Sequence, residues 1–415
     1  MSDQPRPRVA SANRAQLLLH PLDLDSLVAK DHPARSIWAF VEGLDLSAFY
    51  EEIKAVEGEP GRPPIDPKIQ VALWLYATSE GIGSARELAQ LCKAHDAYRW
   101  ICGGVSVNHH SLSDFRVGHG EALDELFTQV LAVLMADDLV TLSRVAQDGT
   151  RARASAGAAS FHRKKKLKKC LQLAREQVRE VKKQADDGSV AAREQAARER
   201  AARERTQRVA HALEELKKVQ ATKATAKEKA EARASSTDPE ARVMKMADGG
   251  FRPAFNIQLA TTTEEKVIVG VDVTNVGSDQ GQVQPMLEQI QERTGERPAE
   301  VLVDGGYCKL KEIDAVQTSG TKVYCPEPKH RDGSEGGVPR EGDSEQIAEW
   351  RERMASPEGK AAYKERGETA ELVNAQFKET FALKLRVRGI KKVLSVALWC
   401  AIAHNIMRWI ALSSS

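Results

Sequence analysis

The sequence predicts a mixed α/β protein with a helical N-terminal domain and a charged helical hairpin inserted into its core. From residue 255 onward, short β-branched stretches alternate with helical patterns, which is typical of a layered α/β core. Residues 61–138 instead carry helix patterns separated by short glycine-containing turns. Between these two regions the chain is dominated by Ala, Arg, Lys and Glu, with apolar residues at helical spacing.

Length and composition narrow the classes of protein. The chain has 415 residues, enough for two or three domains with a buried core. Its net charge of +2 is too small to prove a nucleic-acid partner, so that case depends on where basic residues cluster. The 6 cysteines show no CxxC spacing and no histidines at zinc intervals, which favours a reduced, cytoplasmic protein.

The first third of the chain is expected to be helical. Residues 1–60 are predicted to form a polar arm followed by short helices. Pro67 suits the first turn of the helix that follows it, and a longer helix is expected from about Ser111 to Met135. Residues 61–138 would then be a compact helical domain, either of the helix-turn-helix type that binds DNA or a plain bundle that supports the core.

A strand is expected from Leu142 to Asp148, and the charged region follows it directly. Two apolar sets at helical spacing, separated by the turn Asp186-Asp-Gly-Ser189, predict two helices folded back as a hairpin. We expect residues 160–245 to be an insertion into a catalytic domain that spans residues 139–412. Its basic block, Arg163 to Lys169, favours a contact with DNA; the alternative is that its apolar seam packs on the core or on a second subunit.

The last third is expected to contain the remaining strands and a long apolar helix. FNIQLATT, KVIVGVDVT, AEVLVDGGY and TKVYCPE have the β-branched pattern of strands, with helices between and after them. The apolar run from Val393 to Leu412 contains His404, Asn405 and Arg408, which are costly inside a bilayer. This run therefore predicts a buried helix and not a membrane span.

Three acidic residues are candidates for a metal site. Two of the expected strands end in an acid followed by glycine, Asp148-Gly149 and Asp304-Gly305. In the helical stretch from Tyr363 to Lys378, an α-helical turn of about 100° per residue directs Glu371 to the same face as Tyr363, Arg366 and Lys378. Three carboxylates suit two magnesium ions, and the cations suit phosphate. The alternative for this helix is a solvated surface with Glu/Lys pairs.

The order of these motifs resembles the bacterial insertion-sequence transposases of the DDE type. The motifs are DGT, PAFNIQLAT…VGVDVTNVGSDQGQVQPML, VDGGY, Y-x₂-R-x₄-E-x₆-K and HNIMR, while GRPPIDPKIQVALWLYATSEGIGSARELAQLC…SLSDFR is similar to the helical N-terminal domain of those proteins. The resemblance implies an RNase H-like mixed sheet, in which the first acid lies on the first strand and the second on or just after the neighbouring fourth strand. It covers nearly the whole chain.

By this resemblance Asp148, Asp304 and Glu371 are the catalytic, metal-binding residues, and two Mg²⁺ or Mn²⁺ ions are the cofactors. Tyr363, Arg366 and Lys378 would belong to the motif that contacts phosphate and the ends of the element. The chain departs from the commonly described spacing, because four residues and not three separate the arginine from the glutamate.

The function that this resemblance implies is a DNA transposase. It would bind terminal inverted repeats, cut phosphodiester bonds and transfer a 3′-hydroxyl end to target DNA. Its partners would be double-stranded DNA and a second copy of the chain, with no membrane, in the bacterial cytoplasm at the nucleoid. Two alternatives are a catalytically inactive or domesticated DNA-binding protein and a metal-dependent nuclease without strand transfer.

Overall fold

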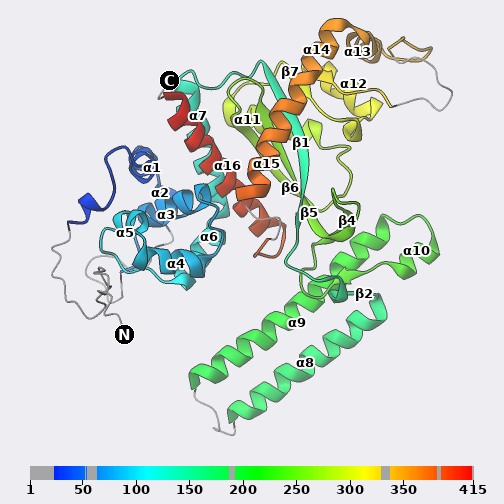
Figure 1. Ribbon diagram of the computed structural model, residues 1–415. Coiled ribbons are helices and arrows are strands. Elements are labelled where there is room, and N and C mark those ends of the chain that lie inside the picture. Colours follow the sequence, from blue (N-terminus) through cyan, green and yellow to red (C-terminus); the bar gives the residue numbers. More distant parts are fainter. Residues whose placement is uncertain are drawn as a thin grey trace, which may run out of the picture.

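The computed structural model describes residues 23–51, 53, 63–186, 192–328, 337–380 and 385–413. Figure 1 shows a group of helices beside a mixed sheet, and a long helical hairpin that projects from one edge of that sheet. The polar arm expected at the start of the chain and part of the loop expected from Lys329 to Asp343 lie outside the described residues.

The helical domain is built around one fully buried helix, α3. It begins at Pro67, as expected, and Asp66 caps it by accepting a hydrogen bond from the Lys68 amide at 2.8 Å. The helix expected from about Ser111 to Met135 is wrong as a single element, because it is divided at His119, which lies between Gly118 and Gly120 and has non-helical dihedrals. The helices are α1 (Pro33–Glu42), α2 (Ser47–Tyr50), α3 (Pro67–Ser79), α4 (Ala85–Ala94), α5 (Asp96–Cys102), α6 (His109–Gly118) and α7 (Gly120–Ala136).

The main sheet has the order β4-β5-β1-β7-β8, and β6 also pairs with β5. β1 is antiparallel to β5 and parallel to β7, which in turn is parallel to β8. Apart from β4, the core strands in chain order are β1, β5, β6, β7 and β8, so the fourth neighbours the first. The strands are β1 (Arg144–Arg153), β4 (Arg242–Lys245), β5 (Phe251–Thr262), β6 (Ile268–Thr274), β7 (Glu300–Leu302) and β8 (Lys322–Tyr324).

This strand order confirms the predicted RNase H-like mixed sheet. One expectation about it is wrong: Asp148 does not end its strand. The long partner β5 continues to pair with β1 beyond that residue, with Asp148 opposite Leu259 and Arg153 opposite Ala254. Only Asp304 follows the end of its strand.

The charged region forms the expected helical hairpin between the first and second core strands. α8 (Lys164–Asp186) and α9 (Ala192–Ala221) pack side by side, and α10 (Ala226–Glu231) and a small sheet of β2 (Phe161–His162) and β3 (Ala234–Ser235) close its base (Figure 1). The apolar seam is buried between the helices themselves, at Leu167, Ala174, Ala202, Val209, Ala212 and Leu216. The seam therefore does not need the core or a second subunit to cover it.

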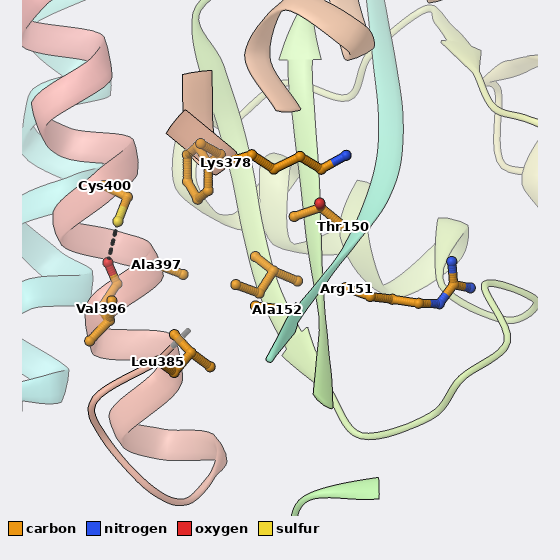
Figure 2. A pocket seen from close by; sticks show the side chains of 10 residues that line it. Thr150, Arg151, Ala152, Lys378, Leu385, Val396, Ala397 and Cys400 are labelled. Carbon is orange, nitrogen blue, oxygen red and sulfur yellow. Dashed lines mark hydrogen bonds between the residues drawn. The ribbon is translucent and has the colours of Figure 1, made fainter. Parts of the chain in front are cut away.

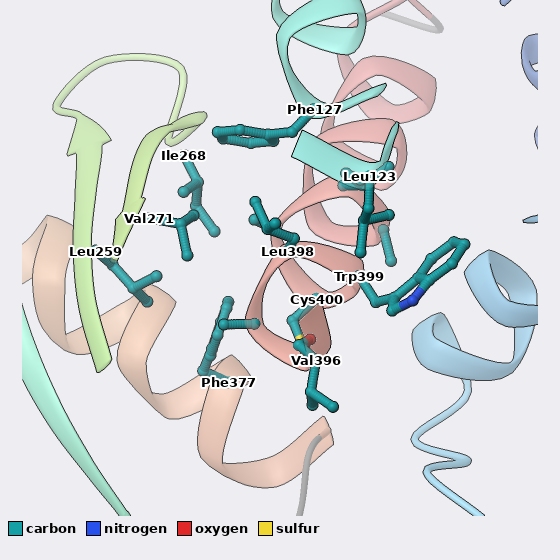
Figure 3. Packing of buried hydrophobic residues seen from close by; sticks show 14 of the residues in the cluster. Leu123, Phe127, Leu259, Ile268, Val271, Phe377, Val396, Leu398, Trp399 and Cys400 are labelled. Carbon is teal, nitrogen blue, oxygen red and sulfur yellow. The ribbon is translucent and has the colours of Figure 1, made fainter. Parts of the chain in front are cut away.

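Helices from the C-terminal part cover the sheet and join it to the helical domain. The apolar run predicted to be a buried helix is α16 (Ile390–Ser413), which is long and apolar enough to cross a membrane but packs against α7, α3 and β6. Figure 3 shows Leu398 of α16 between Phe127 of α7 and the sheet residues Leu259 and Val271. The other elements are α11 (Val283–Thr294), α12 (Leu310–Thr318), α13 (Glu345–Ala355), α14 (Pro357–Arg366), a π-helical turn (Gly367–Glu371) and α15 (Leu372–Thr380).

Candidate active site

Strand register brings the first two candidate acids together. β1 and β7 are parallel neighbours with Ala146 opposite Leu302, and Asp148 and Asp304 each lie two residues further along. Side chains two residues apart share a face of a strand, and neighbouring strands are about 4.8 Å apart. Ala146 and Leu302 pack with Ala362 and Ala370 of the helix from α14 to α15. Asp148 and Asp304 therefore belong to the sheet face that this helix covers.

Asp148 is held by groups on both of its carboxylate oxygens. Its Oδ1 accepts a hydrogen bond from the Gly149 amide at 2.9 Å, and its Oδ2 accepts one from Asn374 Nδ2 at 2.8 Å. Arg366 Nη1 lies 3.8 Å from the same Oδ2. Burial raises the pKa of Asp148, Arg366 opposes this rise, and the carboxylates of Asp304 and Asp279 add to it. Negative charge is thus concentrated here, and a bound cation would relieve it.

Asp304 is positioned by the turn that follows β7. It caps the short helix Gly305–Tyr307, and its Oδ1 accepts a hydrogen bond from the Gly306 amide at 2.7 Å. Tyr307 is buried below it and donates to Gln258 Oε1 at 2.5 Å. Burial raises the pKa of Tyr307, with further contributions from Asp279, Asp148 and Asp304. The phenol of Tyr307 is therefore neutral, and its hydrogen bond to Gln258 fixes its position beside the acidic residues.

A π-helical turn carries the third candidate acid. Glu371 is the last residue of the turn Gly367–Glu371, which follows Arg366 directly. In a π-helix the hydrogen bonds run from residue i to i+5, so each turn holds more residues than in an α-helix. Arg366 and Glu371 are five apart, and the additional residue between them is absorbed by this wider turn. The expectation of a continuous α-helix through Glu371 is wrong. Ala370 of this turn packs against Ala146 and Leu302, whereas Glu371 is exposed.

The candidate site residues on this helix differ in how far their side chains are buried. Arg366 and Tyr363 are half-buried and in contact, with the guanidinium carbon 6.0 Å from the ring centroid. Glu371 is exposed, on the helix between Arg366 and Asn374, the two residues that reach Asp148. Among the described residues, nothing donates a hydrogen bond to its carboxylate. It is not hydrogen-bonded to either aspartate.

Lys378 lies further along β1 and not beside the acids. It lines a cavity of about 30 Å³ between β1, α15 and α16, together with Thr150, Phe377 and Cys400. Figure 2 shows its side chain extending toward β1, above Thr150. Thr150 is two residues after Asp148 and therefore on the same face of the strand. Lys378 can thus contact a ligand that runs along this face from Asp148.

Polar atoms without partners surround Asp148. Within the described residues, Arg366 Nη1, Asn374 Oδ1 and Thr150 Oγ1 are buried and make no hydrogen bond. A buried polar group without a partner is costly and calls for an explanation such as a ligand or ion. An arginine donor suits a phosphate oxygen, and carboxylate and amide oxygens suit a hard divalent cation. The donor set therefore fits a metal and phosphate site.

Two residues of this site carry no motif by which the sequence could have identified them. Asn374 is three residues beyond Glu371, a helical neighbour, but an asparagine there is not distinctive. Asp279 lies in the loop between β6 and α11, where its Oδ1 accepts from Asn256 Nδ2 at 2.6 Å and Gln258 Nε2 at 2.9 Å. Its Oδ2 accepts from Arg151 at 3.2 Å. This engaged carboxylate lies against Gly149 and holds the strand that carries Asp148.

A second group of potential metal ligands occurs at the base of the hairpin, at His211, Glu215 and Glu240. The buried Glu215 is already neutralised, because Arg242 and Lys218 lie 2.5 and 2.7 Å from its two oxygens. Although burial raises the pKa of Glu215, these two hydrogen bonds lower it below its usual range. The group is therefore an ion-pair network that fixes the hairpin and needs no metal.

Comparison with known proteins agrees with the fold. The family described as Transposase domain (DUF772) matches residues 22–117, and the family described as Transposase DDE domain matches residues 220–406. The second match includes Asp304 and Glu371, whereas Asp148 and most of the hairpin fall between the two matches. No curated protein and no solved structure matches the chain.

Both matched families are transposase domains, which places the chain in a class of enzymes that act on nucleic acids. The two matches define the family more narrowly: the chain belongs to the insertion-sequence DDE transposases. Transposases act on DNA, so DNA is its partner.

Proposed function

We propose that this chain cuts DNA at the terminal inverted repeats of its own element and joins the freed 3′-hydroxyl to target DNA. Asp148, Asp304 and Glu371 would hold two divalent cations, Mg²⁺ or Mn²⁺. The observation that carries this proposal is the parallel register of β1 and β7, with two carboxylates on one face beneath the helix of Glu371. When bound, such ions activate a water or hydroxyl and stabilise the leaving oxygen of a phosphodiester.

The side chains around these acids have roles that their contacts suggest. Asn374 and the Gly149 amide fix one oxygen each of Asp148, so its carboxylate cannot rotate. Arg366 has one donor atom, Nη1, without a hydrogen-bond partner among the described residues, and it can donate to a phosphate oxygen beside Asp148. Lys378 can neutralise a phosphate further along β1. Tyr363 supports Arg366 through its ring.

The test is cleavage of a duplex that ends in the terminal sequence of the element. Asp148→Ala, Asp304→Ala and Glu371→Ala should each reduce Mg²⁺-dependent cleavage at least about 100-fold, because each removes a metal ligand worth several kcal/mol. DNA affinity should change little, because most phosphate contacts lie elsewhere. Glu368→Ala is the matched control, as an exposed acid three residues away. Full cleavage by the Glu371 variant with loss in the Glu368 variant would reject the assigned acid.

Strand transfer and pairing of ends need a separate assay. A pre-cut 3′ end incubated with supercoiled target DNA should give joined products; cleavage without joining would make the chain a nuclease. We also propose that two copies pair two ends, since two ends must react and one chain supplies one such set of acids. Light scattering of the complex with end DNA should then give the mass of two chains, and a single-chain mass would refute the homodimer.

A further inference from the structure

Charge is distributed unevenly along the hairpin. We call residues 163–170 and 214–233 the hairpin base, and residues 171–213 the hairpin shaft. The base contains 12 Lys and Arg residues against 4 Glu residues, whereas the shaft contains 10 Lys and Arg against 7 Asp and Glu. The base is also the shorter of the two parts. The base therefore has a much higher density of positive charge than the shaft.

The cations of the base are exposed and mostly unpaired. All of them lie at the surface: Arg163, Lys164, Lys165, Lys166, Lys168, Lys169, Lys217, Lys218, Lys223, Lys227, Lys229 and Arg233. Arg163 pairs with Glu231 at 3.6 Å and Lys218 with Glu215 at 2.7 Å, and in the described part of the chain the other 10 have no carboxylate in ion-pair contact.

The acids of the base do little to neutralise this surface. Glu215 is buried, and Glu228 is engaged in the capping box of α10 with Thr225. The shaft differs, because its charges pair along the helices, as in Glu194 with Arg198 and Glu199 with Arg203. On the shaft, 10 Lys and Arg residues share the surface with 7 Asp and Glu residues, so a polyanion would meet a denser and less neutralised positive surface at the base.

The base is a folded unit fixed to the sheet. Leu167, Ala212, Leu216, Ala232 and Ala234 form a buried cluster that joins α8, α9 and β3. Arg242 of β4 then donates to Glu215 of α9 at 2.5 Å, which fastens the base to the outer strand of the sheet. The lysines are thus presented from a rigid surface and not from a mobile end.

The base lies within reach of the candidate active site. Arg242 pairs with Ala254 of β5, which pairs with Arg153 of β1, five residues after Asp148. Five residues of strand span about 17 Å and two strand spacings about 10 Å, so Asp148 and Arg242 are about 20 Å apart. This is roughly six base pairs of duplex, at about 3.4 Å each.

We infer that the hairpin base, and not the shaft, contacts the backbone phosphates of duplex DNA whose scissile bond lies at Asp148. The inference rests on the proposed function in taking DNA as the ligand. It adds which surface holds that DNA, and it assigns the shaft no direct contact with the phosphates.

The experiment compares two triple variants of the full chain. Lys164→Gln with Lys165→Gln and Lys168→Gln removes three base charges, and Arg175→Gln with Arg179→Gln and Lys182→Gln removes three exposed shaft charges. Glutamine is a good helix former, so both should fold. The affinity for a fluorescent duplex is measured without metal at several NaCl concentrations. A third variant with Lys→Arg at the three base positions keeps the charge and should bind like the unmodified chain.

The base variant should lower the slope of log affinity against log salt by about 2 to 3, since each phosphate contact contributes about 0.9. The shaft variant should change it by less than about 1. Equal losses in both variants, an unchanged slope in the base variant, or a lowered slope in the Lys→Arg variant would each overturn the inference. Changed self-association with unchanged DNA binding would also overturn it and assign the base to a second copy.

The outcome is separable from that of the proposed function. A chain that shows the expected slopes but cuts no DNA would refute the proposed function alone. A chain that cuts DNA with slopes unaffected at the base would refute only the inference about the hairpin.

Discussion

Gly149 follows the first candidate acid at a position where no side chain fits. A Cβ atom there would lie 2.4 Å from Gln258 Nε2, 2.6 Å from Asp279 Oδ1 and 2.7 Å from Asn256 Oδ1. These atoms belong to the network in which Asp279 Oδ1 accepts hydrogen bonds from both amides. Gly149→Ala must therefore displace the carboxylate of Asp279 or move β1 away from it.

The cost can be worked out from these contacts. Overpacking of a buried site costs about 1–3 kcal/mol, and each hydrogen bond to a charged group is worth about 1.5–3 kcal/mol. If the alanine overpacks the site and weakens one such bond, we expect about 3 kcal/mol of destabilisation. This corresponds to a fall in melting temperature of about 6–12 °C. Because the Gly149 amide also holds Asp148 Oδ1, cleavage should fall more than DNA affinity does.

Gly305 supplies the matched control, as it follows the second candidate acid in the same way. A Cβ atom there meets only Pro326, with its Cγ at 3.6 Å, which is an ordinary contact. Gly305→Ala should therefore change stability by less than about 0.5 kcal/mol. Thermal unfolding followed by circular dichroism measures both variants. A Gly149→Ala protein that melts like the unmodified chain, or a Gly305→Ala protein that is equally destabilised, would refute the packing argument.

Three further outcomes are expected. Arg366→Ala and Lys378→Ala should weaken binding of end DNA or the accuracy of cutting, while the Mg²⁺ dependence of cleavage is kept. Unchanged affinity and cleavage in both variants would show that this helix is a solvated surface helix that does not contact DNA. Burial raises the pKa of Asp238 to about 6 from an ordinary 3.8, so stability is lost as pH rises from about 4 to 6. The melting temperature of Asp238→Asn, relative to that of the unmodified chain, should therefore rise as the pH is raised from 4 to 7. A difference in melting temperature that stays constant over this range would contradict this. Deletion of Glu368 should convert the π-helical turn into α-helix, because Arg366 and Glu371 would then be four residues apart and would share a side of that helix. Cleavage should stay within about tenfold of that of the unmodified chain. Unfolding of the variant would show that the π-helical turn is required.

The sequence predicted those parts of the fold that local patterns determine. The β-branched stretches became β5 and β6, the repeated apolar spacing became the hairpin, and the apolar C-terminal run became the buried α16. One of its errors occurred where a distant partner decides the outcome. Asp148 was expected to end a strand, but β5 is long enough to extend the pairing beyond it.

The candidate site was predictable only in part for the same reason. Asp148 and Asp304 were identifiable as acids followed by glycine, but the two glycines have different roles. Gly149 leaves space for Asp279, which approaches from a loop more than a hundred residues away, whereas Gly305 has ordinary surroundings. No local pattern distinguishes them. Asp279 and Asn374 were missed because their roles arise from contacts with residues that are distant in the sequence.

The spacing between Arg366 and Glu371 shows how structure can resolve an apparent departure in sequence. In an α-helix, five residues turn about 500°, which would leave these two side chains about 140° apart. The π-helical turn reduces this offset and takes up the additional residue locally. Ala362 before the turn and Val373 after it both remain buried against the core. Because both ends of the helix keep their contacts, the additional residue is accommodated within the turn itself, and the unusual spacing alone does not argue against Glu371.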